Sequence, residues 1–197
     1  DPAVVEKIVE ILAAAVKPLI ITSDGGEALF EVLSAFAERF AIPVVQFWRT
    51  RPALSTLHPF YAGEDPRPLL LESDAVLVLD TLVPWLPGAT QLREGAKIIQ
   101  VGPDPLFREV PVRSFPADRM LTATSASAVK AVAAGLEAAG YAESSVTAAR
   151  RERLIPALAA RRSRELGAGD DPGGQPMTPQ FMSSVISNTI GADATVV

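Results

Sequence analysis

Cysteine is absent from the 197 residues, which excludes disulfide bonds, thiolate metal sites and a cysteine nucleophile. Histidine occurs only once, at position 58, so a metal centre built from several imidazoles is excluded as well. No apolar run approaches the ~20 residues that cross a bilayer, and no signal peptide is recognisable. We therefore expect a cytoplasmic protein that does not insert into membranes.

Positive charge is also in the minority. The chain has 18 Lys and Arg residues against 23 Asp and Glu residues, which gives a formal net charge of −5. This balance argues against a general surface for nucleic acid. Apolar residues make up 48% of the chain, enough for a sizeable core. The length suits one α/β domain with extensions. The start at Asp1 and the strand-like ending "ADATVV" suggest an excerpt from a longer protein.

Residues 18–47 have the pattern of a strand, a helix and a second strand. "LIIT" at 19–22 is short, apolar and β-branched, as a strand buried on both faces should be. Residues 27–40 form an amphipathic pattern of helical period, and "IPVVQF" at 42–47 follows as the next strand. The segment therefore predicts a βαβ unit.

The alternation continues along the chain. Further strands are expected at 73–80, 96–102 and, more weakly, 118–123; further helices are expected at 3–16 and 125–140, the latter with Ser125 or Ser127 as N-cap and Gly140 as its stop. Strands that alternate with helices predict a mostly parallel sheet with right-handed crossovers. We expect a doubly wound α/β fold with six strands, a Rossmann-like (DHS-like) nucleotide-binding topology.

The character of the sequence changes after Gly140. Residues 144–166 are polar and rich in arginine, and they predict helix on either side of a kink at Pro156. Residues 167–176 have the composition of a linker. We expect a central domain at 1–140 and an interdomain helix with linker at 141–176.

A new pattern begins at residue 177. Thr178 is the expected N-cap and Pro179 the first residue of an apolar helix, followed by a turn at 191–193 and a strand from 194. Residues 177–197 cannot bury their apolar side chains alone. We interpret them as the truncated start of a further domain.

Several segments, taken in order, resemble one family. They are "AAAVKPLIITSDGG", "LSAFAERFAIPVVQ", "LHPFYAG", "SDAVLVLDT" and "AKIIQVGPDP". Together they are similar to the central domain of thiamine-diphosphate-dependent enzymes of the acetolactate synthase and 2-keto-acid decarboxylase group. "MTPQFMSSVISNTIGADATVV" resembles the opening of that family's C-terminal, diphosphate-binding domain. The resemblance covers nearly the whole chain.

The resemblance implies that different domains of the enzyme supply different parts of its active site. In such enzymes the N-terminal domain supplies the glutamate that activates the thiazolium ring, and a Gly-Asp-Gly…Asn motif of the C-terminal domain holds Mg²⁺ and the diphosphate. The chain contains no Gly-Asp-Gly triplet. The resemblance thus implies a longer lyase or transferase that acts on 2-keto acids or related carbonyl compounds as a homodimer or tetramer. Alone, the chain would hold no catalytic or metal-binding residue.

The stretch "TSDGG" at 22–26 is the main candidate for cofactor binding. Its strand opens onto Gly25 and Gly26, as nucleotide sites do, but the G-x-G-x-x-G fingerprint is missing. One interpretation is a turn in which Ser23 or Asp24 caps the helix. The other is a loop that touches a flavin or ADP, as in some relatives. The candidate cofactor-binding residues are Ser23, Asp24, Gly25, Gly26, Thr81 and Asp104.

Three departures from the family's flavin-binding pattern argue against FAD. Relatives with flavin carry an arginine shortly after the third strand, whereas this chain continues "TLVPW" and has no basic residue before Arg93. Where relatives read Asp-x-Asp-Pro, the chain reads Gly102-Pro103-Asp104-Pro105. Where they show Gly-Asp, the chain has Ala123-Thr124. We interpret the nucleotide site as one that has lapsed.

Other polar or aromatic positions favour structural roles. His58 has no acidic or nucleophilic neighbour in the sequence, and Trp85 lies between two prolines, which suits packing or a domain contact. Asp80, at the end of a strand, is the best-placed acid and could bind loop backbone or line the pocket. The arginines of 150–164 predict a solvated helix. The main rival hypothesis is a self-contained module that binds FAD, ADP or NAD.

Overall fold

The computed structural model describes residues 1–110, 115–167, 173 and 176–190. Contacts divide the chain into two compact units, Asp1–Ile155 and Pro156–Val197. Most of the expected linker, the expected turn at 191–193 and the expected strand from residue 194 lie outside the described residues.

A parallel sheet forms the centre of the first unit. Its strands are β1 (Pro18–Thr22), β2 (Val44–Gln46), β3 (Ala75–Leu79), β4 (Lys97–Gly102) and β5 (Arg119–Thr122). The strand order is β2-β1-β3-β4-β5, and every neighbouring pair is parallel. All residues of β1, β2 and β3 are buried, as their unbroken apolar runs require. The predicted α/β class with a mostly parallel, Rossmann-like sheet is confirmed.

The described residues contain five strands of this sheet, one fewer than expected. The nearest equivalent of a sixth strand is the segment 60–63, which lies along the outer side of β2. There Val44 forms an isolated parallel bridge with Tyr61, and the N–H of Gln46 donates to the carbonyl of Gly63 at 3.0 Å. The segment stays too short for a ladder because Pro59 precedes it and Pro66 follows soon after.

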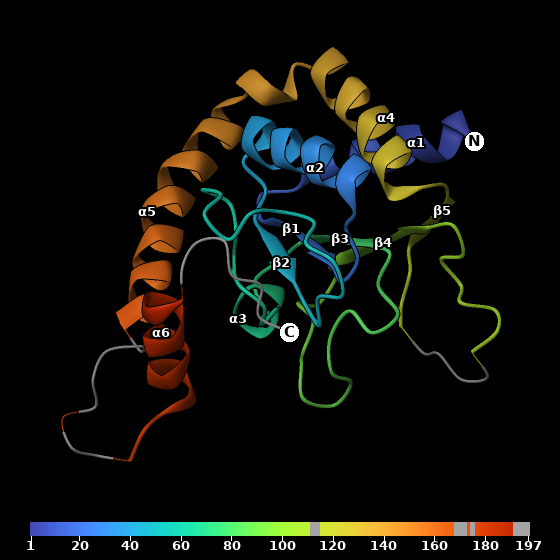
Figure 1. Ribbon diagram of the computed structural model, residues 1–197. Helices are drawn as coiled ribbons and strands as arrows, with labels where there is room; N and C mark the ends of the chain where they lie inside the picture. The colour runs from blue at the N-terminus through green and yellow to red at the C-terminus, as the bar shows by residue number, and fades with distance from the viewer. Residues whose placement is uncertain (111–114, 168–172, 174–175, 191–197) are drawn as a thin grey trace. The chain divides into compact units, whose positions relative to one another are not determined.

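Helices cover the sheet unevenly. Figure 1 shows α1 (Pro2–Ala14), α2 (Glu27–Phe40) and α4 (Ser125–Ala138) together on one side of the strands, and the single turn α3 (Arg67–Leu70) with long loops on the other. The N-cap of α4 is Thr124, whose hydroxyl accepts from the N–H of Ser127. The expectation of Ser125 or Ser127 was therefore wrong. The Ser125 hydroxyl is bound elsewhere, to Asp80.

The short helix η1 (Tyr141–Glu143) leads into α5 (Ser145–Gly167), which is helical through Pro156. The expectation that its arginines are all solvated is wrong for Arg150, which is only 2% exposed. Its guanidinium donates to the carbonyls of Phe40 (2.7 Å), Ala41 (2.9 Å) and Ala15 (3.3 Å). Ala41 and Ala15 are the C-caps of α2 and α1. Arg150 thus places positive charge where two helix dipoles end.

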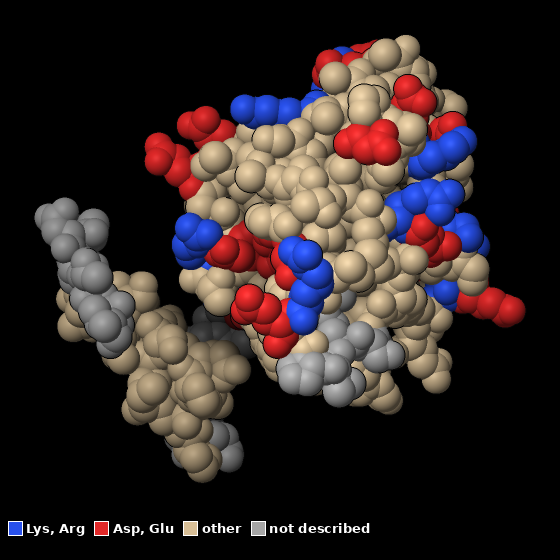
Figure 2. Space-filling view, turned by 90° about the vertical axis from the view of Figure 1, so that its right-hand side faces the viewer, with Lys and Arg blue, Asp and Glu red and all other residues tan. Residues whose placement is uncertain are grey.

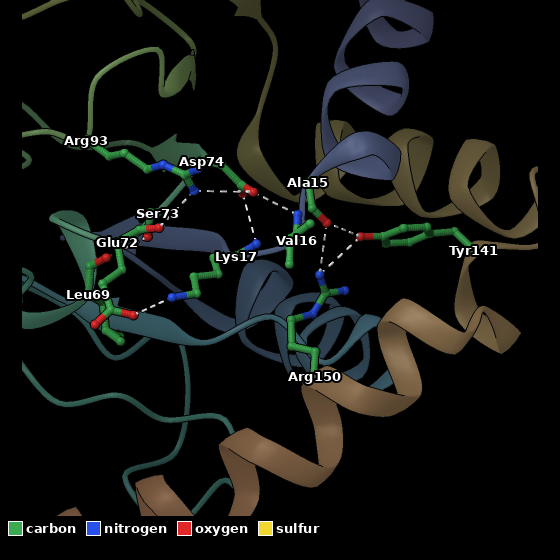
Figure 3. Close-up of polar contacts among 10 residues, drawn as sticks. All are labelled: Ala15, Val16, Lys17, Leu69, Glu72, Ser73, Asp74, Arg93, Tyr141 and Arg150. Carbon is green, nitrogen blue, oxygen red and sulfur yellow. Dashed lines mark hydrogen bonds and ion pairs between the residues drawn. The ribbon is translucent and has the colours of Figure 1, made fainter.

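A hydroxyl network completes this contact. Figure 3 shows the Tyr141 hydroxyl and Arg150 converging on the Ala15 carbonyl, and the Tyr141 hydroxyl also accepts from Arg150 at 3.1 Å. Nearby, the Asp74 carboxylate accepts from the backbone N–H groups of Val16 and Lys17, both at 2.9 Å. The start of β1 and the first turns of α5 are therefore fixed to the same end of the sheet.

The second unit contains the end of α5 and helix α6 (Pro179–Thr189). The hydroxyl of Thr178 accepts from the N–H of Phe181 at 3.1 Å, and Pro179 occupies the first turn. This confirms the predicted helix start. None of the α6 residues is buried, and Met182, Val185 and Ile186 are each more than 40% exposed.

Charged side chains on the outer surface of the first unit are locally balanced. On the face in Figure 2, basic and acidic side chains lie beside one another around a broad uncharged region. The ion pairs of the first unit include Lys97 with Asp118 at 3.1 Å and Lys7 with Glu10 at 2.8 Å. None of the described helices is both long and apolar enough to cross a membrane.

Candidate functional site

The strand order places the topological switch point between β1 and β3, since the chain runs outward from these two strands in opposite directions. Open α/β sheets bind ligands at this point, outside the carboxyl ends of the strands. In this chain the residues there are the turn after β1, which holds Ser23 to Gly26, and the residues after β3, Asp80 and Thr81. The predicted residues Ser23 to Gly26 and Thr81 therefore lie at the edge where sheets of this kind bind ligands.

The turn after β1 is closed by an ion pair. Arg51 donates through Nε to Oδ1 of Asp24 and through Nη2 to Oδ2, each at 2.6 Å, and Thr50 adds a hydroxyl contact at 3.2 Å. The hydrogen bond from Arg51 lowers the pKa of Asp24 against the opposing effect of partial burial. Asp24 is therefore ionised at neutral pH, and its partner guanidinium is already bound.

Each of the two glycines is required by the protein's own packing. A Cβ at Gly25 would overlap the carbonyl of Pro52 and lie 2.5 Å from Cα of Ala53. Gly26 has φ +86° and is the N-cap of α2, where no side chain caps the helix. The suggestion that Ser23 or Asp24 caps α2 was therefore wrong. The glycines make a turn that lets the loop 50–53 approach closely.

The other predicted cofactor contacts are bound to the protein itself. The Ser23 hydroxyl donates to the carbonyl of Phe47 at 2.6 Å, and the buried Thr81 hydroxyl donates to that of Leu79 at 2.8 Å. Asp104 accepts from the N–H of Arg108 at 2.9 Å and so closes its own turn. Whether any of these residues touches a cofactor stays a prediction.

Asp80, directly after β3, combines an unusual backbone conformation with a raised pKa. Its backbone has φ +43°, and its Oδ2 accepts from the Ser125 hydroxyl at 2.6 Å. Burial raises the pKa of Asp80, and the nearby charge of Asp24 adds to the rise, while the Ser125 hydrogen bond and the Arg51 charge act in the opposite direction. A Cβ at position 102 would lie 2.8 Å from Oδ1, so Gly102 is what makes room for this carboxyl group.

The crevice thus combines two carboxyl groups, Asp24 and Asp80, with one guanidinium that Asp24 already binds. A pyrophosphate needs free N–H donors or positive charge, and it would meet negative charge here. The two carboxyl groups oppose the phosphates of FAD or ADP, although the uncapped start of α2 leaves backbone N–H donors at the same turn. Within the described part of the chain, no three His, Asp or Glu side chains gather in a group that could hold a metal ion.

His58 and Trp85 have packing roles, as the sequence suggested. Nδ1 of His58 accepts from the N–H of Phe60 at 3.1 Å. Trp85 is 4% exposed and packs edge-to-face on Phe115 with ring centroids 5.3 Å apart. The sequence reasoning missed the partners Arg51 and Ser125. No local signal could have found them, because they lie 27 and 45 residues from the carboxylates they bind.

The comparison with protein families decides the assignment. The family described as "Thiamine pyrophosphate enzyme, central domain" matches residues 5–131, which is more than half of the chain. The chain belongs to this family. A search of curated protein sequences finds no match.

Solved structures support the fold of this thiamine pyrophosphate enzyme central domain. Benzoylformate decarboxylase from Polynucleobacter necessarius is similar with a TM-score of 0.51 and 22% identity. A protein from Mycobacterium smegmatis assigned as a thiamin diphosphate-dependent enzyme is similar with a TM-score of 0.54 and 24% identity. Each match covers 67% of this chain but only 26% and 27% of the other chain, respectively. This chain therefore spans only about a quarter of the length of these two proteins.

Proposed function

We propose that this central domain is part of a longer thiamine-diphosphate-dependent enzyme that makes or breaks a C–C bond next to the carbonyl of a 2-keto acid or related substrate. The support is the family match over residues 5–131 and the likeness to much longer chains. When bound, thiamine diphosphate supplies an electron sink for such bonds. Other domains would hold it with Mg²⁺, because the described residues of this chain offer no group of metal ligands.

In this proposal the central domain supports the chemistry without performing it. The observation that carries the proposal is the set of charged side chains at the switch point. The Arg51 guanidinium is bound to Asp24, and Asp80 adds a second carboxyl group. The domain would act as a spacer and as part of the roof of an active site. Residues 141–176 would connect it to a further domain that begins at residue 177, in a homodimer or tetramer.

The same observation argues against a self-contained nucleotide-binding module. Such a module would need its donors to outweigh the two carboxyl groups at the turn after β1, where the Ser23 hydroxyl and two N–H groups of Arg51 are already bound to the protein. A module of this kind would also bind FAD, ADP or NAD without any other domain.

Calorimetric titration of two proteins tests the proposal. The 197-residue chain should bind neither thiamine diphosphate with Mg²⁺ nor FAD, ADP or NAD. The longer enzyme should bind thiamine diphosphate with Mg²⁺ and release CO₂ or a condensation product from 2-keto acids. Binding of any of these nucleotides by the chain alone, or failure of the longer enzyme to bind thiamine diphosphate, would contradict it.

A further inference from the structure

A pocket lies among the segments that follow β2 and β3, and its walls include none of the switch-point residues Ser23 to Gly26, Asp80 and Thr81. It has a volume of about 360 Å³, within the range of small-molecule sites. Three segments supply its walls: Phe47 and Trp48 directly after β2, residues 64–67 before and at the start of α3, and the loop after β3 with Leu86 and Thr90. None of the predicted cofactor contacts lines it.

The aromatic wall of this pocket is held in place by the core. Phe47 and Trp48 are stacked with ring centroids 5.0 Å apart and an angle of 16° between the planes. The Ser23 hydroxyl fixes the Phe47 carbonyl, as described above. The buried Gln46 side chain accepts from the N–H of Ala53 at 2.7 Å and donates to the carbonyl of Leu54 at 2.9 Å. The loop that presents the indole is therefore preorganised.

Trp48 has a strained backbone conformation and an exposed side chain. Its φ is +47°, a left-handed conformation that bulky residues rarely adopt, and its side chain lies in the open, with the residue 61% exposed. Strained backbone that surrounding contacts maintain is common at ligand sites. The strain here places a large flat aromatic surface beside a pocket, where a flat ligand could cover it.

The polar groups of the pocket are nearly balanced in charge. Arg67 donates to Asp65 through Nε and Nη2, at 2.9 and 2.8 Å, and Glu64 pairs with Arg49 at 3.3 Å. The walls therefore favour neither a strongly anionic nor a strongly cationic ligand. A phosphorylated ligand gains no free guanidinium here.

One polar atom of the pocket lacks a partner. The Thr90 hydroxyl oxygen is buried without a hydrogen bond to any described residue, and a buried unsatisfied hydroxyl costs free energy. Rotation about the Cα–Cβ bond of Thr90 exchanges its hydroxyl and methyl positions. A polar group on a ligand in the pocket could thereby gain a hydrogen bond that the protein does not provide.

We propose that this pocket binds a small planar aromatic molecule without phosphate, whose ring stacks on Trp48 and whose single polar substituent pairs with Thr90. The proposal goes beyond the function proposed above and does not rest on it. The stacked pair supplies affinity for a flat ring. The balanced ion pairs and the unpartnered hydroxyl define the rest of the ligand as uncharged with one hydrogen-bonding group.

Benzamide is a suitable probe, since it joins one aromatic ring to one amide. Its matched control is cyclohexanecarboxamide, which has the same amide on a ring that cannot stack. The chain has two tryptophans, so its NMR spectrum offers two indole N–H signals, and Trp85→Phe identifies the signal of Trp48. Benzamide should shift this signal saturably, with a dissociation constant in the millimolar range expected of a fragment.

Variants separate stacking from simple apolar burial. Trp48→Ala should abolish the saturable binding, observed then on the amide signals of Glu64, Asp65 and Arg67, and thermal melting checks that the variant is folded. Thr90→Val should weaken binding about fivefold through the lost hydrogen bond, and Thr90→Ser should retain it. Cyclohexanecarboxamide should bind several-fold more weakly than benzamide. Equal binding of the two amides, no saturable shift up to the solubility limit, or full binding by folded Trp48→Ala would overturn the proposal.

Discussion

Asp24 and Arg51 are joined by two hydrogen bonds of 2.6 Å across the first βα turn of the sheet. In a nucleotide-binding relative of this topology, the same position faces the phosphates of the ligand. Here a carboxylate takes that place, and the protein's own guanidinium satisfies it. The relationship shows how a domain can keep the strand order and the paired glycines of a cofactor fold while it places a paired carboxylate at its switch point.

The ion pair predicts a pH dependence of stability. The folded-state pKa of Asp24 is lowered, so Asp24 contributes stability above its unfolded pKa of about 3.9. That contribution falls as the pH drops through the folded-state pKa. Urea unfolding of the chain and of Asp24→Asn should therefore differ by a constant amount between about pH 5 and 7, and the difference should vanish at strongly acidic pH. A difference that persists there would show that the charge is not its cause.

The charge of Asp80 should lower the stability of the folded chain at neutral pH, opposite to the charge of Asp24. Burial raises the folded-state pKa of Asp80, so its ionisation opposes folding. This penalty is absent below the unfolded pKa of about 3.9, grows as the pH rises above it, and is complete once the pH exceeds the folded-state pKa. Asp80→Asn keeps an acceptor for Ser125 and suits the left-handed backbone. It should raise the free energy of unfolding at pH 7 by less than about 1 kcal/mol, since water screens this half-buried group. At pH 3 the gain should disappear.

Alanine provides the control for that position. Asp80→Ala removes the acceptor for the Ser125 hydroxyl, and its Cβ tolerates φ +43° poorly. It should destabilise the chain by about 1–2 kcal/mol at both pH values. If both substitutions changed stability alike, the charge of Asp80 would not be the source of the effect.

Arg150 should be the most costly arginine of α5 to replace. Its removal leaves the carbonyls of Phe40 and Ala41 without their donors, so Arg150→Met should lower the free energy of unfolding by about 3 kcal/mol. Arg150→Lys should recover only part, because one ammonium group cannot reach both helix ends. The exposed Arg153 is the matched control, and its replacement by Met should cost no more than about 0.5 kcal/mol. Equal losses for the two Met variants in urea unfolding would contradict this role.

The packing of the first βα turn can be tested at Gly25. A methyl group there must displace the backbone of Pro52, so Gly25→Ala should destabilise the chain by about 1–3 kcal/mol. Gly88 has φ +79° but nothing within 4 Å of an added Cβ, so Gly88→Ala should cost only the conformational ~1 kcal/mol. Thermal melting of both variants measures the difference. A Gly25→Ala variant as stable as Gly88→Ala would mean that loop 50–53 does not approach as described.

Local patterns were sufficient to predict most of the fold. The apolar runs at 19–22, 73–80 and 96–102 contain most of β1, β3 and β4, because a strand buried on both faces accommodates such runs. Strand count was harder to predict, since segment 60–63 pairs with β2 through a single bridge. Helix caps were predicted only where the capping residue had no competing partner. Thr178 is such a residue, whereas Ser125 is bound to Asp80.

The sequence indicated where the switch point of the sheet lies but not which side chains meet there. The glycines and strand ends indicated the switch point, because those signals are local. What fills the crevice depends on Arg51, whose partner lies 27 residues away. Arg150 likewise belongs to an arginine-rich stretch whose pattern indicates a solvated helix. Its burial depends on the ends of α1 and α2, 135 and 109 residues distant.

Cofactor release from the longer enzyme tests the central claim most directly. The purified protein would be precipitated with acid, and the small molecules in the supernatant would be identified by chromatography and absorbance. We expect thiamine diphosphate without any flavin or adenine nucleotide, since the carboxyl groups of Asp24 and Asp80 oppose their phosphates. FAD released in a one-to-one ratio with the chain would contradict the account and show that this crevice still binds a nucleotide.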